Sequence, residues 1–274
     1  MRTTPLQFTT VSRSAEGPSS IHYAQIDYAR IVKSGNSLAV VSVEEEDADT
    51  ARQPITLPEG HVIIGLGHGA SPTPAAEKIL TEAAVRLIST VGDHSWKPEA
   101  LPIESLVQSQ AYIFASDELR DGATRRVYAA RMGDAVAVDG ATIGALHALD
   151  AEMIDETHQK FATRYGMRKR RERGGQDPTN VALDIAGDAV TAIAADVTRL
   201  LGMAPALSIL DLESNYPEDL ACTFAVTDMM PVGFRVGARK YSDQADVRAA
   251  IDEELHRARL VPRMIEQTVH LLDL

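Results

Sequence analysis

The sequence predicts an α+β protein: an N-terminal β-rich domain followed by a mainly α-helical C-terminal domain. Three observations support this prediction. The first hundred residues are rich in short alternating apolar runs typical of strands. Residues 97–106, KPEALPIESL, contain two prolines and predict an interdomain linker. Beyond them the apolar residues recur at helical spacing. We therefore expect domains at 1–98 and 107–274.

Within the N-terminal part, SIHYAQIDYARIVKSGNSLAVVSV (20–43) predicts a hairpin that turns at Ser34-Gly35-Asn36. HVIIGLG (61–67) and VRLISTVGD (85–93) predict two further strands. Between them, PTPAAEKILTEAA predicts a short helix with prolines at its start. The acidic run EEEDADTARQP from residue 44 is typical of a solvated loop.

The C-terminal part predicts helices over 107–131 and 141–165, and the clearest helix follows at 177–202. There Asp177 can cap, Pro178 suits the first turn and Gly202 suits the stop. Its apolar stripe makes it the expected spine of the domain (Val181, Ile185, Ala189, Ile193, Val197, Leu200). SILDL (208–212) and LACTFAV (220–226) predict a hairpin around ESNYPED. Residues 243–274 predict a helix interrupted at Pro262.

Composition argues against several classes of protein. Cys222 is the only cysteine, which excludes an internal disulfide and a cysteine zinc cluster and fits a reducing cytoplasm. No run approaches the roughly 18 apolar residues of a membrane helix, and the N-terminus lacks the apolar core of a signal peptide. The net charge of −12 disfavours nucleic-acid binding unless basic side chains gather locally.

One run, MRKRRER, does gather them (Arg168, Lys169, Arg170, Arg171). It is a plausible phosphate contact, and a solvated loop explains it equally well. The glycines of GLGHG (65–69) superficially resemble a dinucleotide-binding turn, so a nucleotide-binding enzyme stays a remote alternative. Their G-x-G-x-G spacing and the prolines that follow favour a plain tight turn. Nucleophilic catalysis has no support, because Cys222 lies in a predicted strand and no G-x-S-x-G occurs.

Three acidic residues are candidates for a metal site. Asp211 and Asp228 each end an apolar run, and Asp150 sits on a predicted helix in HALDAEMIDE. Mg²⁺ prefers carboxylate oxygens supplied by several separate elements. The alternative is that all three are helix caps or solvated acids, as most aspartates are.

Seven segments, in this order, resemble one known family: YAQID (23–27), LPEGHVIIGLGHGASPTPAA (57–76), ISTVGDHS (88–95), LDAEMIDETHQKFATRYG (149–166), DPTNVALDIAGDAVTAI (177–193), GMAPALSILD (202–211) and FAVTDMM (224–230). The family is the CRISPR-associated integrase, the first Cas protein, which is the metal-dependent subunit of the spacer-acquisition complex. The resemblance is nearest to the subtype that works beside the Cascade effector.

The resemblance implies an N-terminal β-rich dimerisation domain and a helical catalytic domain. It also implies a homodimer, with two dimers flanking a dimer of a small ferredoxin-like second Cas protein. The implied reaction is attack of a prespacer 3′-hydroxyl on a repeat phosphodiester, with Mg²⁺ or Mn²⁺. The family's ligand glutamate falls on Asp150, its histidine on Asp211 and its ligand aspartate on Asp228. A second family aspartate falls on Ala225 and is absent.

For DNA contacts, the resemblance matches Tyr23 to a tyrosine that packs at the end of the prespacer duplex. It places Lys97 near a family arginine and the run 168–171 in a basic, DNA-facing connection. Since two of the three family ligands are substituted, two functions remain open within the family. One is an active integrase, and the other is a catalytically inactive homologue that acts as a DNA-binding or assembly subunit.

Overall fold

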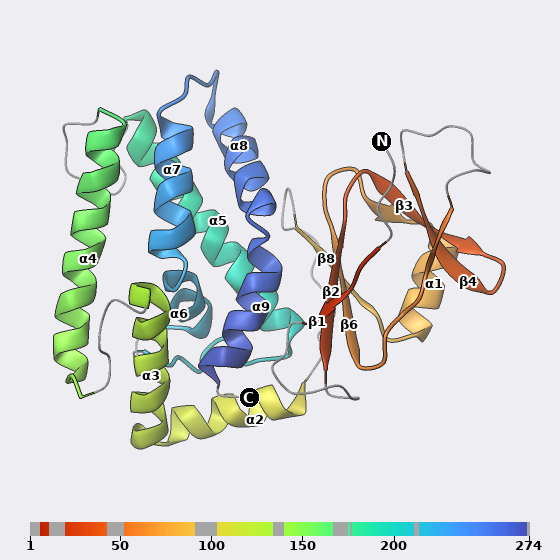
Figure 1. Ribbon diagram of the computed structural model, residues 1–274, viewed down its shortest axis with the longest axis horizontal. Helices are drawn as coiled ribbons and strands as arrows, with labels where there is room; N and C mark the ends of the chain where they lie inside the picture. The colour runs from red at the N-terminus through yellow and green to blue at the C-terminus, as the bar shows by residue number, and fades with distance from the viewer. Residues whose placement is uncertain are drawn as a thin grey trace.

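The computed structural model describes residues 6–10, 20–42, 52–90, 103–133, 140–166, 175, 177–210 and 214–272. Figure 1 shows the strands gathered at one end of the molecule and the long helices at the other. This arrangement confirms the predicted α+β class with β-rich and then helical parts. Most of the predicted linker, residues 97–102, lies outside the described residues.

Two four-stranded sheets form the β-rich part. The first has the order β1 (Thr9–Thr10), β2 (Ile21–Ile26), β6 (His61–Leu66) and β8 (Arg86–Ser89), and its last three strands run parallel. The second has the order β5 (Gln53–Ile55), β4 (Ser37–Ser42), β3 (Ala29–Ser34) and β7 (Ser71–Pro72). Strands β3 and β4 form the predicted hairpin, since Ser34 pairs with Ser37 across a turn at Gly35.

Helix α1 (Pro74–Glu82) lies between β6 and β8 in the chain, as the crossover between parallel strands requires. The Thr73 hydroxyl caps it by accepting from the Ala76 amide, and Pro74 occupies the first turn, where no amide donor is needed. The inner faces of both sheets and one side of α1 bury a shared apolar cluster that includes Ile31, Ile64 and Leu80. The small helix predicted here is therefore confirmed.

The helical part comprises α2 (Glu104–Ala115), α3 (Asp117–Met132), α4 (Ile143–Arg164), α5 (Pro178–Leu200), α6 (Tyr216–Cys222), a π-helix (Ala225–Met229), α7 (Met230–Gly237), α8 (Gln244–Arg257) and α9 (Leu260–Leu271). Helix α5 is its spine, as predicted, and α6 to α9 all pack against it. Asp177 caps α5 by accepting from the Asn180 amide, and Gly202 follows its end with a positive φ of 72°.

Two sequence predictions in this part are wrong. The described residues of 208–226, which exclude 211–213, form no hairpin: α6 and the π-helix take the place of its second strand. The Asn215 side chain caps α6 by accepting from the Glu218 amide, and Pro217 fits its first turn, so this turn-like stretch is a helix start. The C-terminal helix breaks at Ala258 and Arg259 rather than at Pro262, because a proline within the first turn of α9 interrupts nothing.

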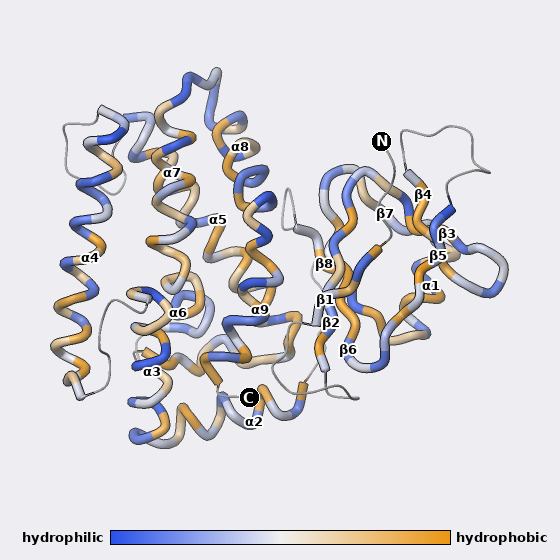
Figure 2. The backbone as a smooth tube through the Cα atoms, in the orientation of Figure 1, coloured by the Kyte–Doolittle hydropathy of each residue, from blue (hydrophilic) through white to orange (hydrophobic). Residues whose placement is uncertain are grey.

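One apolar cluster runs from the strands into the helices. It joins Ile21, Tyr23, Ile63 and Ile88 of the first sheet to residues of α2, α3 and α5 to α9. Figure 2 shows apolar stretches along both the central strands and the helices. At the same junction, His256 of α8 lies 2.7 Å from Asp27. The shared core fixes the strands against the helices. No helix of the described residues has the length and hydropathy needed to cross a membrane.

Candidate functional site

Asp150 lies on α4, whose N-terminus is capped by the Thr142 hydroxyl. Its Oδ2 is 2.9 Å from Nη1 of Arg131 on α3, and both side chains are only 8% exposed. The same guanidinium also lies 3.7 Å from the Cys222 sulfur at the end of α6. The other carboxylate oxygen, Oδ1, is buried without a hydrogen-bond partner among the described residues. Asp150 is therefore a buried carboxyl group, paired with Arg131 through one oxygen and with the other oxygen unused.

The environment of Asp150 alters three titrations. Burial raises the pKa of Asp150, and the charge of Arg131 opposes that rise. Burial and the Asp150 charge together raise the pKa of Tyr128. Burial also raises the pKa of the Cys222 thiol to about 12, although Arg131 opposes it. This raised pKa favours the thiol form of Cys222 at neutral pH.

Asp228 lies on the π-helix, a type of element often found at functional sites. Its two oxygens accept from Arg263 of α9, Oδ1 from Nη1 at 2.6 Å and Oδ2 from Nη2 at 2.9 Å. The Thr227 hydroxyl donates to Oδ2 at 2.6 Å. The Asp228 side chain is 5% exposed and that of Arg263 is 40% exposed. Both oxygens of this carboxylate are therefore already engaged.

Asp211, the third candidate ligand, lies outside the described residues. The side chain that holds the chain on either side of it is described. Asp219 on α6 is buried, and its Oδ2 accepts from the amides of Ile209 and Leu210 and from the Ser208 hydroxyl. Its Oδ1 accepts from the Ser214 hydroxyl. One carboxylate thus fastens the chain on both sides of residues 211–213. Sequence reasoning missed this role because it read the helix start around Asn215 as a turn.

The predicted metal ligands are carboxylates, which suit a hard cation chemically. The described residues supply only part of the coordination that such an ion needs. Carboxylate oxygens are the donors that Mg²⁺ and Mn²⁺ prefer. The unused Oδ1 of Asp150 is such a donor, whereas Asp228 is paired with Arg263. Within the part of the chain that is described, no group of three or more His, Cys, Asp or Glu residues could hold a metal ion. Asp150 pairs with Arg131, whereas Asp228 pairs with Arg263, so each carboxylate contacts a different arginine.

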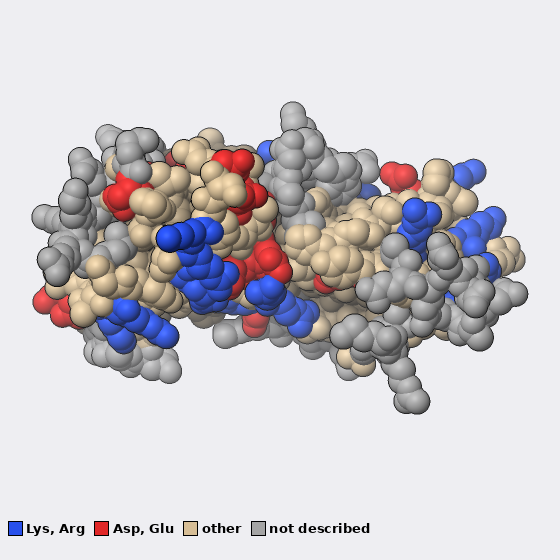
Figure 3. All heavy atoms as spheres, turned by 90° about the horizontal axis from the view of Figure 1, so that it is seen from above, with Lys and Arg blue, Asp and Glu red and all other residues tan. Residues whose placement is uncertain are grey.

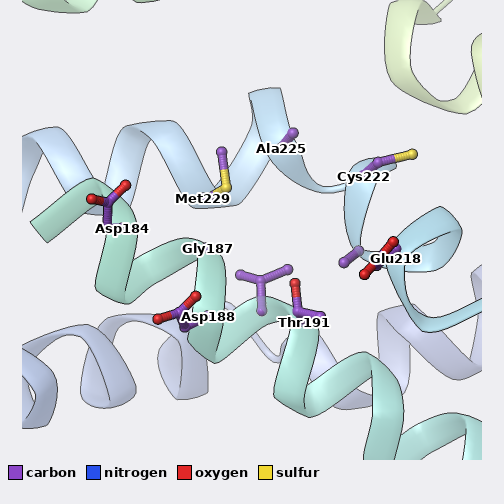
Figure 4. Close-up of a pocket in the computed structure, with 10 residues that line it drawn as sticks. Asp184, Gly187, Asp188, Thr191, Glu218, Cys222, Ala225 and Met229 are labelled. Carbon is purple, nitrogen blue, oxygen red and sulfur yellow. The ribbon is translucent and has the colours of Figure 1, made fainter. Parts of the chain in front are cut away.

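A cavity of about 510 Å³ lies between α5, α6 and the π-helix. Figure 4 shows Asp184 and Asp188 on α5 and Glu218 on α6 among its lining residues. Ala225, where the resembled family carries a second aspartate, also lines it. The cavity is thus acidic and adjoins the element that bears Asp228.

Of the residues predicted to contact DNA, one is buried and the others lie outside the described residues. Tyr23 is fully buried in β2, and its hydroxyl donates to Gln25 at 3.3 Å. Burial raises the pKa of Tyr23 well above its ordinary value, although Arg259 opposes the rise. In this conformation the ring has no exposed face on which a base could stack. The other predicted contacts lie outside the described residues (Lys97, Arg168, Lys169, Arg170, Arg171).

An arginine cluster that sequence reasoning missed surrounds Glu254 of α8. Arg235, Arg239 and Arg257 all pair with this one buried carboxylate, and their side chains remain substantially exposed. Figure 3 shows Lys and Arg side chains gathered beside Asp and Glu side chains over the helical part. The sequence carries two local signals, the four-residue spacing of Arg235 and Arg239 and the three-residue spacing of Glu254 and Arg257 on α8. The pairing of Arg235 and Arg239 with Glu254 depends on how separate segments pack. The cluster gathers exposed guanidinium groups at one place on an otherwise acidic chain.

The GLGHG turn leaves no room for a phosphate at Gly67. A Cβ built there would lie 1.9 Å from Oδ1 of Asp27 and 2.6 Å from the His256 ring. Gly69 has a φ of 63°, as a tight turn requires. A neighbouring carboxylate also repels phosphate, so the local geometry favours a structural turn over a nucleotide site.

Comparison with known proteins gives matches among solved structures. No protein-family model and no curated protein matches the sequence. The structure of a TtCas1–DNA complex matches with a TM-score of 0.66 at 20% identity, covering 92% of this chain and 96% of that one. A crystal structure of TtCas1 matches with the same TM-score at 21% identity, covering 91% of this chain and 97% of that one. The likeness spans both the strands and the helices. This chain therefore has the fold of Cas1 proteins.

Proposed function

We propose that the chain belongs to the Cas1 family, in the CRISPR spacer-acquisition system, and that it acts as an integrase that inserts DNA fragments into the repeat array. The observation that carries this proposal is the placement of Asp150 and Asp228 within a Cas1 fold. The resemblance assigns both residues to the catalytic site, and both are buried carboxylates on elements of the helical part. Buried acids are costly, so their presence here calls for a positive partner.

In this proposal Asp150, Asp211 and Asp228 hold Mg²⁺ or Mn²⁺. The bound ion would lower the pKa of the attacking 3′-hydroxyl and neutralise charge on the phosphodiester oxygens. The chain's own contribution is to hold its carboxylates in place. Arg131 orients Asp150 through Oδ2 and leaves Oδ1 for another cation. Asp219 fixes the chain on both sides of Asp211.

DNA is the proposed partner, together with a second copy of the chain and the small ferredoxin-like Cas protein. The cluster of Arg235, Arg239 and Arg257 is the described surface that suits a phosphate backbone. Lys97 and the run 168–171 are proposed to extend this contact, and Tyr23 would have to leave the core to join it. A cytoplasmic location is proposed from the unpaired Cys222.

A second candidate function is a DNA-holding or assembly subunit without catalysis. The specific observation in its favour is that arginines already neutralise both described carboxylates, Arg131 at Asp150 and Arg263 at Asp228. An ion pair of this kind compensates the buried carboxylate charge without any metal. The resemblance also favours this second function, because Asp150 and Asp211 stand where the family has a ligand glutamate and a ligand histidine.

Strand transfer distinguishes the two functions. A labelled short duplex is incubated with a repeat-bearing plasmid and the small partner, in Mg²⁺, in Mn²⁺ or with a chelator. We expect metal-dependent products from the native chain, none from Asp150→Asn, and normal amounts from Asp155→Asn. Asp155 is the matched control because it is an exposed acid on the same helix as Asp150. Absence of products from the native chain, with DNA binding retained, would establish the assembly subunit instead.

A further inference from the structure

The Asp228–Arg263 pair differs from an ordinary buried ion pair in one respect. The guanidinium engages both carboxylate oxygens, at 2.6 and 2.9 Å, in the paired geometry that makes such contacts strong. Yet the acid is 5% exposed while the arginine is 40% exposed. The positive partner can therefore be approached from solvent, whereas Asp228 is shielded by it.

The rest of the Arg263 environment is weakly polar. Its guanidinium carbon lies 5.3 Å from the centre of the Phe224 ring, and Nη1 is 3.4 Å from the Ala258 carbonyl oxygen. Arg263 lies one helical turn beyond Arg259, whose φ of 53° marks the break between α8 and α9. Asp228 is its only carboxylate partner within the described part of the chain. A second anion would therefore compete with Asp228 alone.

Phosphate is the anion most suited to that competition. A guanidinium binds a phosphate with the same two-pronged geometry that it uses for a carboxylate. Arg131 offers no such opportunity, because its side chain is only 8% exposed. The two arginines at the candidate site therefore have different capacities: Arg131 is fixed in the interior, and Arg263 is accessible from outside.

We propose that Arg263 is a latch on the candidate metal site. In the DNA-free protein it holds Asp228 and keeps a divalent cation from it. A phosphate of bound DNA takes the guanidinium over and leaves the carboxylate for the ion. The latch rests on the proposed function, since it requires Asp228 to be a ligand. It makes Arg263 a positioning residue, which controls the ligand rather than touching the reacting atoms.

The latch couples DNA binding to metal binding, and the coupling is reciprocal. Hydrogen bonds to a charged group have a net strength that corresponds to roughly 10- to 100-fold in affinity. Duplex DNA should therefore tighten Mn²⁺ binding by about that factor. Removal of the guanidinium should produce the same gain without DNA and abolish the response to DNA.

The test measures free Mn²⁺ by electron paramagnetic resonance during titration of the native chain, Arg263→Gln and Arg199→Gln. Arg199 is the matched control, because it is 43% exposed and lies 2.6 Å from Asp196, which is 9% exposed. Each protein is titrated with and without a short duplex. We expect weak Mn²⁺ binding by the native chain alone, and tighter binding with DNA. Arg263→Gln should bind tightly in both conditions, and Arg199→Gln should behave as the native chain does.

Two results overturn the latch, and they differ in what else they overturn. Equal Mn²⁺ affinity of the native chain and Arg263→Gln without DNA would show that Arg263 does not guard Asp228, and the proposed metal site would survive. No Mn²⁺ binding by any variant, with or without DNA, would reject the metal site together with the latch. Loss of stability without a change in Mn²⁺ affinity would identify a structural ion pair only. If Arg263→Gln fails to fold, the native titration with and without DNA decides.

Discussion

The buried pair of Arg131 and Asp150 allows a prediction whose size follows from the structure. Replacing Arg131 by methionine keeps an unbranched side chain, although one about two atoms shorter, and removes the charge. Both partners are only 8% exposed, so the Asp150 charge would remain buried without compensation. Removing one member of a buried ion pair costs about 3–5 kcal/mol of unfolding free energy. In a chain of this size that loss lowers the melting temperature by about 6–20 °C.

The loss should depend on pH, with a sign fixed by the titration of Asp150. Burial already raises the pKa of Asp150, and Arg131 limits the rise. Without Arg131, the folded-state pKa moves further above the unfolded value, so the folded state keeps a proton that the unfolded chain releases. Stability then falls as pH rises from the unfolded pKa to the folded pKa. Urea denaturation should show a larger loss at pH 8 than at pH 5.

The double variant Arg131→Met with Asp150→Asn is the control. It removes the titrating group, so its stability relative to Asp150→Asn should be nearly independent of pH. A loss of less than about 1 kcal/mol for Arg131→Met at pH 8 would refute the reasoning, because it would mean that water or another cation reaches Asp150. An equal loss at both pH values would show that Asp150 does not control the effect.

Three further predictions concern packing and anchoring. In Gly233→Ala the new Cβ would meet Leu183 Cδ2 at 2.7 Å, which should cost about 1–3 kcal/mol in urea denaturation; unchanged stability would show that α5 and α7 can part freely. Asp219→Ala should cost about 3 kcal/mol or more, because amides and hydroxyls lose a buried acceptor, and a loss below about 1 kcal/mol would contradict that anchor role. Burial acts to raise the pKa of Asp27, but the bond from His256 and further hydrogen bonds lower it overall. Its stabilisation should therefore be present above the unfolded pKa and disappear as pH falls through the folded pKa, so the stability difference between the native chain and Asp27→Asn should shrink below about pH 4.

The sequence was sufficient for elements whose ends and faces are both marked. Helix α5 has a cap at Asp177, a proline in its first turn and a continuous apolar stripe, and each signal selects the same residues. The hairpin at Gly35 was equally clear. The stretch 208–226 misled because apolar runs of five to seven residues suit strand and helix alike. There the Asn215 cap was the deciding signal.

The candidate site was only partly predictable. Asp228 could be singled out because it ends an apolar run, Asp150 because it sits on a predicted helix, and both from the resemblance; both are buried. Their partners Arg131 and Arg263 could not, because each pairing depends on how separate helices pack. The same holds for Arg235 and Arg239, which reach Glu254 from another segment, whereas Arg257 lies three residues from Glu254 on the same helix. Charge counts along a chain do not reveal such neighbours.

The apolar cluster shared by strands and helices means that the predicted domain boundary near residue 100 does not separate two independent cores. Ile21, Ile63 and Ile88 belong to the first sheet, yet they bury their side chains in the same core as helix α5. A chain cut in the linker would leave each fragment with half of a core facing water. The shared core therefore predicts that the strands and the helices unfold together in one cooperative transition.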